Sequence, residues 1–227
     1  MSSSSNIIGP SHLVIATLNP DDMGRYLAKA GYQGNHYAPG LKNPQAKAPF
    51  IQGELSLLCD MVLFTSNNGL PPIELLSEPQ ATFAGTDQAT AFEPLSIPDD
   101  MEGPIEIRVR CQNPAKAASF WRAAGGGKEK PENEAARLSF DRNIAAPAMD
   151  LVYVRSEEHP STTWLNTPGL SAVSFLCRDA SSLRDDLDSR GYECGEVFKI
   201  APFGKKLSVF FARNLSREIY EFLSLDR

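Results

Sequence analysis

The sequence predicts an α+β fold built from three repeated β-α-β-β-β modules, and three observations support this prediction. Three segments share one order of features: an apolar run, a helix-start signal, a short amphipathic stretch and a glycine. Further strand-like runs follow each of these glycines. The stretches between the repeats are rich in Pro, Gly, Ser and Thr, as linkers commonly are. The three repeats begin at Ser11, Ile105 and Ser171.

The first strand and the helix of each repeat are marked by local signals. Each repeat opens with β-branched and other apolar residues, which is typical of a strand. Asn19, Asn113 and Asp179 follow, and Asn and Asp are favoured at the N-cap of a helix. In the first two repeats the next residue is proline, which suits the first helical turn. A glycine ends each helical stretch, as expected for a left-handed C-cap. These glycines are Gly31, Gly125 and Gly191.

Strand-like runs after each helix complete the repeats and set the predicted boundaries. An insert at residues 38–52, rich in Pro, Lys and Asn, is predicted to form a loop near a pocket mouth or an interface. The Ser-rich start lacks the basic and apolar regions of a signal peptide, so we expect a disordered tail. The predicted organisation is a tail at 1–10, a first module at 11–79, a linker at 80–103, a second module at 104–156, a linker at 157–168 and a third module at 169–227.

Composition excludes several classes of function. The net charge of -6 argues against a nucleic-acid surface and against docking on an anionic membrane. No run of about 18 apolar residues is present, as a membrane-spanning helix would require. The four cysteines are far apart and form no C-x-x-C pair, which favours reduced thiols in a cytoplasmic protein. We therefore expect a cytoplasmic protein with neither a nucleic-acid nor a membrane partner.

The third repeat carries the strongest resemblance to a known family. It opens with GLSAVSFLCRDASSLRDDLDSRGYE and closes with FGKKLSVFFARNLSREIYEFLSL, in which Tyr220, Glu221 and Phe222 match a terminal signature. These segments resemble the vicinal-oxygen-chelate superfamily, which includes glyoxalase I, extradiol dioxygenases, methylmalonyl-CoA epimerase, and fosfomycin and bleomycin resistance proteins. The resemblance covers nearly the whole chain in pattern. It implies a glyoxalase-like fold, in which the modules form curled mixed sheets around a pocket.

The resemblance also implies a set of metal ligands. In this superfamily the ligands come from the start of the first strand and from the last strand of a module. Carried over, His12 and Glu74 would be metal ligands, and Glu221 a reserve ligand or general base. Ala172 stands where the third module would supply another ligand and cannot bind a cation. A divalent metal (Fe, Mn, Ni or Zn) would hold two adjacent substrate oxygens. The positions in the second module are Glu106 and Asp150.

Charged residues alternate along the first strand of the second module. Because strand side chains alternate between faces, Glu106, Arg108 and Arg110 share one face. One interpretation is a pocket wall, in which Arg108 and Arg110 bind an anionic substrate. The other is a ladder of ion pairs, in which Glu106 would be a poor metal ligand.

Three modules leave two pairings and three functional hypotheses open. Modules two and three would form one glyoxalase-like domain while the first pairs with its twin in a homodimer, an arrangement favoured by the long linker at 80–103. Alternatively, the first module pairs with a neighbour in the chain. The leading hypothesis is a metal-dependent lyase, isomerase or dioxygenase acting on a small oxygenated substrate. The alternatives are a metal-free small-molecule binding or drug-sequestering protein, and a non-catalytic structural or regulatory module.

Overall fold

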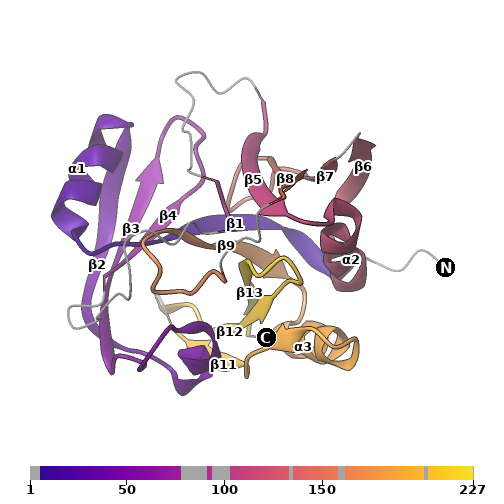
Figure 1. Ribbon diagram of the computed structural model, residues 1–227. Coiled ribbons are helices and arrows are strands. Elements are labelled where there is room, and N and C mark those ends of the chain that lie inside the picture. The colour runs from indigo at the N-terminus through magenta and orange to yellow at the C-terminus, as the bar shows by residue number, and fades with distance from the viewer. Residues whose placement is uncertain are drawn as a thin grey trace.

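The computed structural model describes residues 6–77, 91–93, 103–132, 135–157, 162–201 and 204–226 (Figure 1). The predicted α+β fold of three β-α-β-β-β modules is confirmed. The first module contains β1 (Ile7–Ala16), α1 (Pro20–Lys29), β2 (Tyr32–Lys42), the 3-10 helix η1 (Gln45–Phe50), β3 (Leu58–Ser66) and β4 (Ile73–Ser77). The second contains β5 (Ile105–Cys111), α2 (Pro114–Ala124), β6 (Lys128–Glu132), β7 (Ala135–Phe140) and β8 (Met149–Arg155). The third contains β9 (Gly169–Cys177), α3 (Ala180–Ser189), β10 (Glu193–Cys194), β11 (Phe198–Ile200), β12 (Leu207–Arg213) and β13 (Ile219–Leu225).

The predicted helix signals act as expected. The side chains of Asn19, Asn113 and Asp179 accept hydrogen bonds from backbone N–H groups three residues later, at 3.2, 3.0 and 3.0 Å. These bonds satisfy donors that the first turn of a helix leaves without partners. After the second helix, Gly125 has a φ of 68°, a left-handed conformation that glycine adopts at little cost. None of the helices in the described ranges is both long and apolar enough to cross a membrane.

The first and third modules share one curled sheet. Its strand order is β10-β12-β13-β9-β1-β4-β3-β2, with β11 also paired to β12. At its centre β1 and β9 run antiparallel, with Leu13 opposite Val173 and Val14 opposite Ala172. Each is flanked by the last strand of its own module, running parallel to it: β4 beside β1, and β13 beside β9. The first and last strands of both modules are therefore four neighbours in the middle of the sheet.

The second module has a separate four-stranded sheet, of order β5-β8-β7-β6. The prediction that modules two and three form one glyoxalase-like domain is therefore wrong, since β9 pairs with β1 (Figure 1). The alternative pairing of neighbouring modules is also not observed. The predicted homodimer required the first module to pair with its twin, but the third module occupies that edge of β1.

The linker before the second module explains why that module stays outside the shared sheet. Glu93 donates its backbone N–H to the carbonyl of Arg108 at 2.9 Å, and Arg110 donates to that of Ala91 at 2.8 Å. Residues 91–93 thus lie along the edge of β5 that faces away from β8. The corresponding edges of β1 and β9 pair with each other and join the first and third modules. Phe92 is 1% exposed and anchors the segment. Most of the predicted linker at 80–103 lies outside the described residues.

The second module packs through α2 against the face of the shared sheet that carries Phe175 and Tyr220. Trp121 of α2 is fully buried, and its ring lies 4.6 Å from that of Phe175 and 4.7 Å from that of Tyr220. Phe120, one residue earlier, stacks 5.5 Å from Tyr220. These rings, with those of Phe140 and Phe222, form a contiguous aromatic core between the second and third modules. Burying this apolar area stabilises the attachment of the second module.

Two predicted boundaries need correction. The chain enters β1 at Ile7, so residues 7–10 of the predicted tail belong to a strand, and Arg178 donates its backbone N–H to Asn6 at 2.9 Å. Residues 158–161 of the linker at 157–168 lie outside the described ranges. The rest of that linker is packed, since Thr163 is fully buried and Leu165 donates to the carbonyl of Phe50 at 2.8 Å.

Candidate functional site

Residues 42–53, which we call the strap, cross from the first module to the third. Gln52 and Asn166 exchange two hydrogen bonds of 3.0 Å between backbone and side chain. Phe50 packs in an apolar cluster with Val14, Ala172 and Phe211. The register places these residues on the face that also carries Glu74 and Glu221, because Glu74 lies opposite Val14 and Glu221 opposite Phe211. The strap therefore encloses a hollow on this face.

Three ionisable side chains from three central strands converge in this hollow. His12 of β1 places Nε2 3.1 Å from Oε2 of Glu221 on β13 and 3.4 Å from Oε2 of Glu74 on β4. Their side chains are 12%, 8% and 22% exposed, in the order His12, Glu221, Glu74. They come together because the modules join through β1 and β9, which places β4 and β13 symmetrically on the two sides of the joint.

The electrostatics of the three groups are strongly coupled. Burial alone would lower the pKa of His12, but the nearby carboxylates of Glu221 and Glu74 outweigh burial and raise that pKa to about 10. Burial acts to raise the pKa of Glu74, whereas contact with His12 and the charge of Lys47 lower it, and the net direction is down. Without a bound cation, a charged imidazolium therefore lies between two carboxylates.

The three side chains are of the chemical type that binds a divalent metal, and the two distances from His12 are of the size that metal ligands have. Two ligands held about 2.1 Å from one metal at angles between 90° and 109° lie roughly 3.0–3.4 Å apart, as His12 Nε2 lies from each carboxylate. Nε2 of His12 and Oε2 of Glu221 are buried and make no hydrogen bond of acceptable geometry in the described ranges. Nevertheless, no three such side chains in that part of the chain are already arranged to hold a metal ion.

The position expected for a fourth ligand is closed. Ala172 is fully buried beneath the apolar cluster of the strap, with Phe50 on the same side of the sheet. No protein donor replaces it from this position. Two strand positions along, Ser174 lies opposite Glu221, and its buried Oγ has no hydrogen-bond partner in the described ranges. Strand alternation places Ser174 on the face of Ala172, a signal that the sequence analysis did not use.

A cavity of about 490 Å³ opens onto Glu74 and Glu221. Its apolar wall comes from both modules and includes Met61, Leu76, Phe198 and Ile200. Lys42, Lys47 and His36 also line it. The prediction that the insert at 38–52 lies near a pocket mouth agrees with this lining, although its first residues, 38–42, belong to β2. The two lysines were not among the predicted site residues, because only the tertiary structure shows which loop side chains line the cavity.

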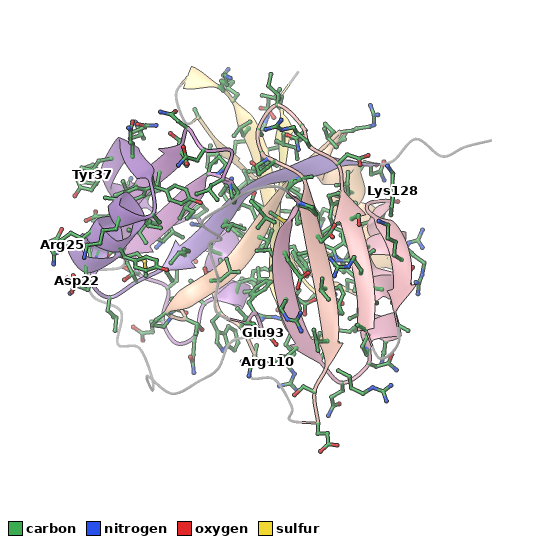
Figure 2. The ribbon with its side chains drawn as sticks, turned by 90° about the horizontal axis from the view of Figure 1, so that it is seen from above. Asp22, Arg25, Tyr37, Glu93, Arg110 and Lys128 are labelled. Atoms are coloured by element: carbon green, nitrogen blue, oxygen red, sulfur yellow. The ribbon has the colours of Figure 1, made fainter. Side chains whose placement is uncertain are left out.

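Arg108 and Arg110 are not brought together with these residues. Both lie on β5 of the separate sheet, and neither lines the cavity above. Figure 2 shows Arg110 on this sheet, near Glu93. Arg108 forms ion pairs of 2.9 Å with both Glu93 and Glu106. The ladder interpretation of this strand therefore describes Arg108 and Glu106, and a substrate-binding role for either arginine stays a prediction. Asp150 is likewise paired, with Arg137 at 2.6 Å.

Comparisons with known proteins give matches among solved structures only. No family model and no curated protein matches the sequence. Similar structures include a putative dioxygenase from Bacillus subtilis, at 12% identity over 97% of this chain and 86% of that one, with a TM-score of 0.46. A methylmalonyl-CoA epimerase from Mycobacterium tuberculosis is similar at 11% identity over 100% and 94%, with a TM-score of 0.46. A glyoxalase/bleomycin resistance protein/dioxygenase from Alicyclobacillus acidocaldarius is similar at 14% identity over 56% of this chain and 93% of that one, with a TM-score of 0.38. These names are among those that the sequence resembles, and the likeness is one of fold.

Proposed function

We propose that the hollow between the first and third modules binds a divalent metal through His12, Glu74 and Glu221, and through it a small oxygenated molecule. The observation that supports this proposal most is the convergence of one imidazole and two carboxylates, largely buried, at 3.1 and 3.4 Å. Burying such groups is costly unless something compensates them. The closed position at Ala172 would leave the metal with three protein ligands and open positions for a ligand's oxygens.

Each residue has a defined part in this proposal. His12 would donate Nε2, while Ser11 Oγ, 3.1 Å from Nδ1, orients the ring from its other side. Glu74 and Glu221 would supply the negative charge. A divalent metal held there would polarise a bound oxygen as a Lewis acid. Glu221, whose Oε2 has no hydrogen-bond partner among the described residues, was predicted to be a reserve ligand or a general base, and in this proposal it is a ligand. Such a site would serve a lyase, isomerase or dioxygenase.

A metal-free binding protein is the second candidate, and one observation favours it specifically. The two carboxylates raise the pKa of His12 to about 10, so the three side chains form a charge-compensated group without any cation. In that case the cavity of about 490 Å³ would bind a small molecule directly, since its volume is in the usual range for ligand pockets. In the first candidate Nε2 of His12 binds a metal, and in the second it carries a proton.

Metal binding by the full chain tests the proposal. Equilibrium dialysis against Mn²⁺, Fe²⁺, Ni²⁺ and Zn²⁺, followed by metal analysis, should give about one bound metal per chain for at least one of the four. We expect His12→Ala and Glu221→Gln to weaken that binding by about a hundredfold or more, because even outer-shell partners of metal ligands contribute 10–100-fold. His36→Ala is the matched control, since His36 lines the same cavity but is not a proposed ligand.

Two results would contradict the proposal. Unchanged affinity in His12→Ala would remove His12 from the site. If the wild-type chain binds none of the four metals, the metal-free candidate replaces it, and small organic acids should then raise the melting temperature without any metal. Circular dichroism of each variant separates loss of the site from loss of the fold.

A further inference from the structure

Two lysines enter the cavity from the strap and its junction with β2. Lys42 ends β2 and is exposed, and Lys47 lies in η1, half-buried, with Nζ 5.9 Å from the centre of the Phe211 ring. Both line the cavity that also contains Glu74 and Glu221. Neither forms an ion pair with a carboxylate anywhere in the described part of the chain. Two basic residues therefore line the same cavity as Glu74 and Glu221.

The charge balance changes when a metal occupies the proposed site. A divalent cation carries two positive charges, and the carboxylates of Glu74 and Glu221 cancel them while His12 binds as a neutral imidazole. The metal-loaded cavity would hold an excess positive charge from Lys42 and Lys47. A pocket with one sign of charge and low-dielectric walls favours a ligand of the opposite sign.

The remaining wall limits the shape of such a ligand. Met61, Leu76, Phe198 and Ile200 make most of the lining apolar, so the ligand needs an apolar body as well as a charged group. The strap is attached to the third module through Phe50 and to the segment before that module through the paired bonds of Gln52 with Asn166. Such fixed placement reduces the entropy that an anion-binding side chain loses on binding.

We propose that Lys42 and Lys47 select the charge of the ligand, so that the cavity takes a small molecule with metal-binding oxygens, a short apolar body and a separate carboxylate or phosphate. This proposal rests on the proposed metal site for the metal-binding end of the ligand. The strap, not the strand arginines of the second module, then determines the preference for an anion.

A pair of chelating probes that differ only in charge tests this proposal. Glutaric monohydroxamate carries two vicinal oxygens at one end and a carboxylate at the other, and its counterpart carries a primary amide in place of the carboxylate. Calorimetric titration of the metal-loaded full chain should show the carboxylate probe binding about tenfold to a hundredfold more tightly, as expected for charge-assisted hydrogen bonds. Lys42→Gln/Lys47→Gln should bring the two affinities within about twofold of each other, because uncharged glutamines remove the Coulomb attraction that distinguishes a carboxylate from an amide.

Variants of matched chemistry complete the test. Lys42→Arg/Lys47→Arg keeps the charge and should keep a clear preference for the carboxylate probe, and Lys29→Gln, on α1 and outside the cavity, should bind as wild type does. The metal content of every variant is measured first, and we expect the lysine variants to retain it. A preference that survives in the double glutamine variant, or no preference in the wild type, would overturn the proposal.

Failure of the metal site gives a different pattern from failure of the lysines. If the wild type binds no metal, the proposed function is contradicted, and the same two probes are titrated into the metal-free chain. A lysine-dependent preference there would still support charge selection by the strap. Equal affinities, or no binding of either probe, would overturn it.

Discussion

Replacing Trp121 by alanine is expected to lower the free energy of unfolding by about 3–5 kcal/mol, the range typical for removing a large buried aromatic side chain. Trp121 is fully buried between the second module and the shared sheet. Its ring contacts those of Phe140, Phe175 and Tyr220, with centroids 4.9, 4.6 and 4.7 Å away. The substitution also removes the indole N–H that donates to the hydroxyl of Tyr153 at 2.8 Å. Urea titration followed by circular dichroism measures the change.

The chain's other tryptophan is the matched control. Trp164 is only partly buried, and the guanidinium carbon of Arg213 lies 4.8 Å from the centre of the Trp164 ring. We expect Trp164→Ala to lower the free energy of unfolding by less than half as much, because this substitution removes much less buried apolar area. Equal costs for the two substitutions would mean that the second module does not depend on this aromatic core.

The second large effect concerns a buried acid at the junction of the second and third modules. Trp121 donates to Tyr153, the hydroxyls of Tyr153 and Tyr220 are 2.7 Å apart, and Tyr220 donates to Oε1 of Glu218 at 3.1 Å. Because Tyr220 has a single O–H and donates it to Glu218, the bond between the two hydroxyls is donated by Tyr153, and the chain of hydrogen bonds runs in one direction, toward Glu218. Asn214 donates to the same Oε1 at 2.8 Å.

Burial nevertheless dominates the ionisation of Glu218. It raises the pKa of this carboxyl from 4.5 to about 7, against hydrogen bonds that act in the other direction. Below pH 4.5 the carboxyl is protonated whether the chain is folded or not, and its burial costs nothing extra. Between pH 4.5 and about 7 the folded state holds a proton that the unfolded state has lost, so stability falls as pH rises. The full cost, roughly 3 kcal/mol, is present above pH 7.

Glu218→Gln should remove this dependence. We expect the free energy of unfolding of the variant, relative to wild type, to rise by roughly 3 kcal/mol between pH 4.5 and pH 8. The glutamine oxygen can still accept from Tyr220 and Asn214, so the hydrogen bonds to Oε1 are retained. Urea titrations of both proteins across this pH range give the comparison.

Glu54→Gln is the control for this series, because Glu54 is exposed on the surface of the first module. Its curve should stay parallel to that of wild type. A curve for Glu218→Gln that is also parallel to wild type would show that Glu218 keeps its charge in the fold at no cost.

Local signals in the sequence were sufficient to predict the modules but not their pairing. Asn19, Asn113 and Asp179 cap helices through bonds to neighbours three residues away, and such contacts depend on nothing distant. The pairing of β1 with β9 brings together residues more than 150 positions apart, such as Leu13 and Val173. It depends on which faces bury the most apolar area, and the aromatic face of α2 covers the opposite side of the sheet from the hollow. The length of the linker at 80–103 was therefore a poor guide, since Phe92 holds part of it against β5.

The candidate site shows the same division. The resemblance implied His12, Glu74 and Glu221 from their places in first and last strands, and the structure brings all three within ion-pair distance. Lys42, Lys47 and Ser174 were missed, because lining a cavity is a property of the folded surface rather than of the strand pattern. For Arg108 the sequence left an anion ligand and an ion pair both open, because strand alternation shows which face a residue occupies but not what that face meets. In the structure it meets Glu93 and Glu106.

By itself, the sequence determined the three β-α-β-β-β modules and the limits of their helices. These properties follow from caps, glycines and the two-residue strand period, which act over a few positions. Only the tertiary structure decided that the first and third modules share a sheet, that Ala172 is closed by the strap and that two lysines face the hollow. Such features depend on competition among long-range contacts, whose free energies become comparable only once the chain is packed.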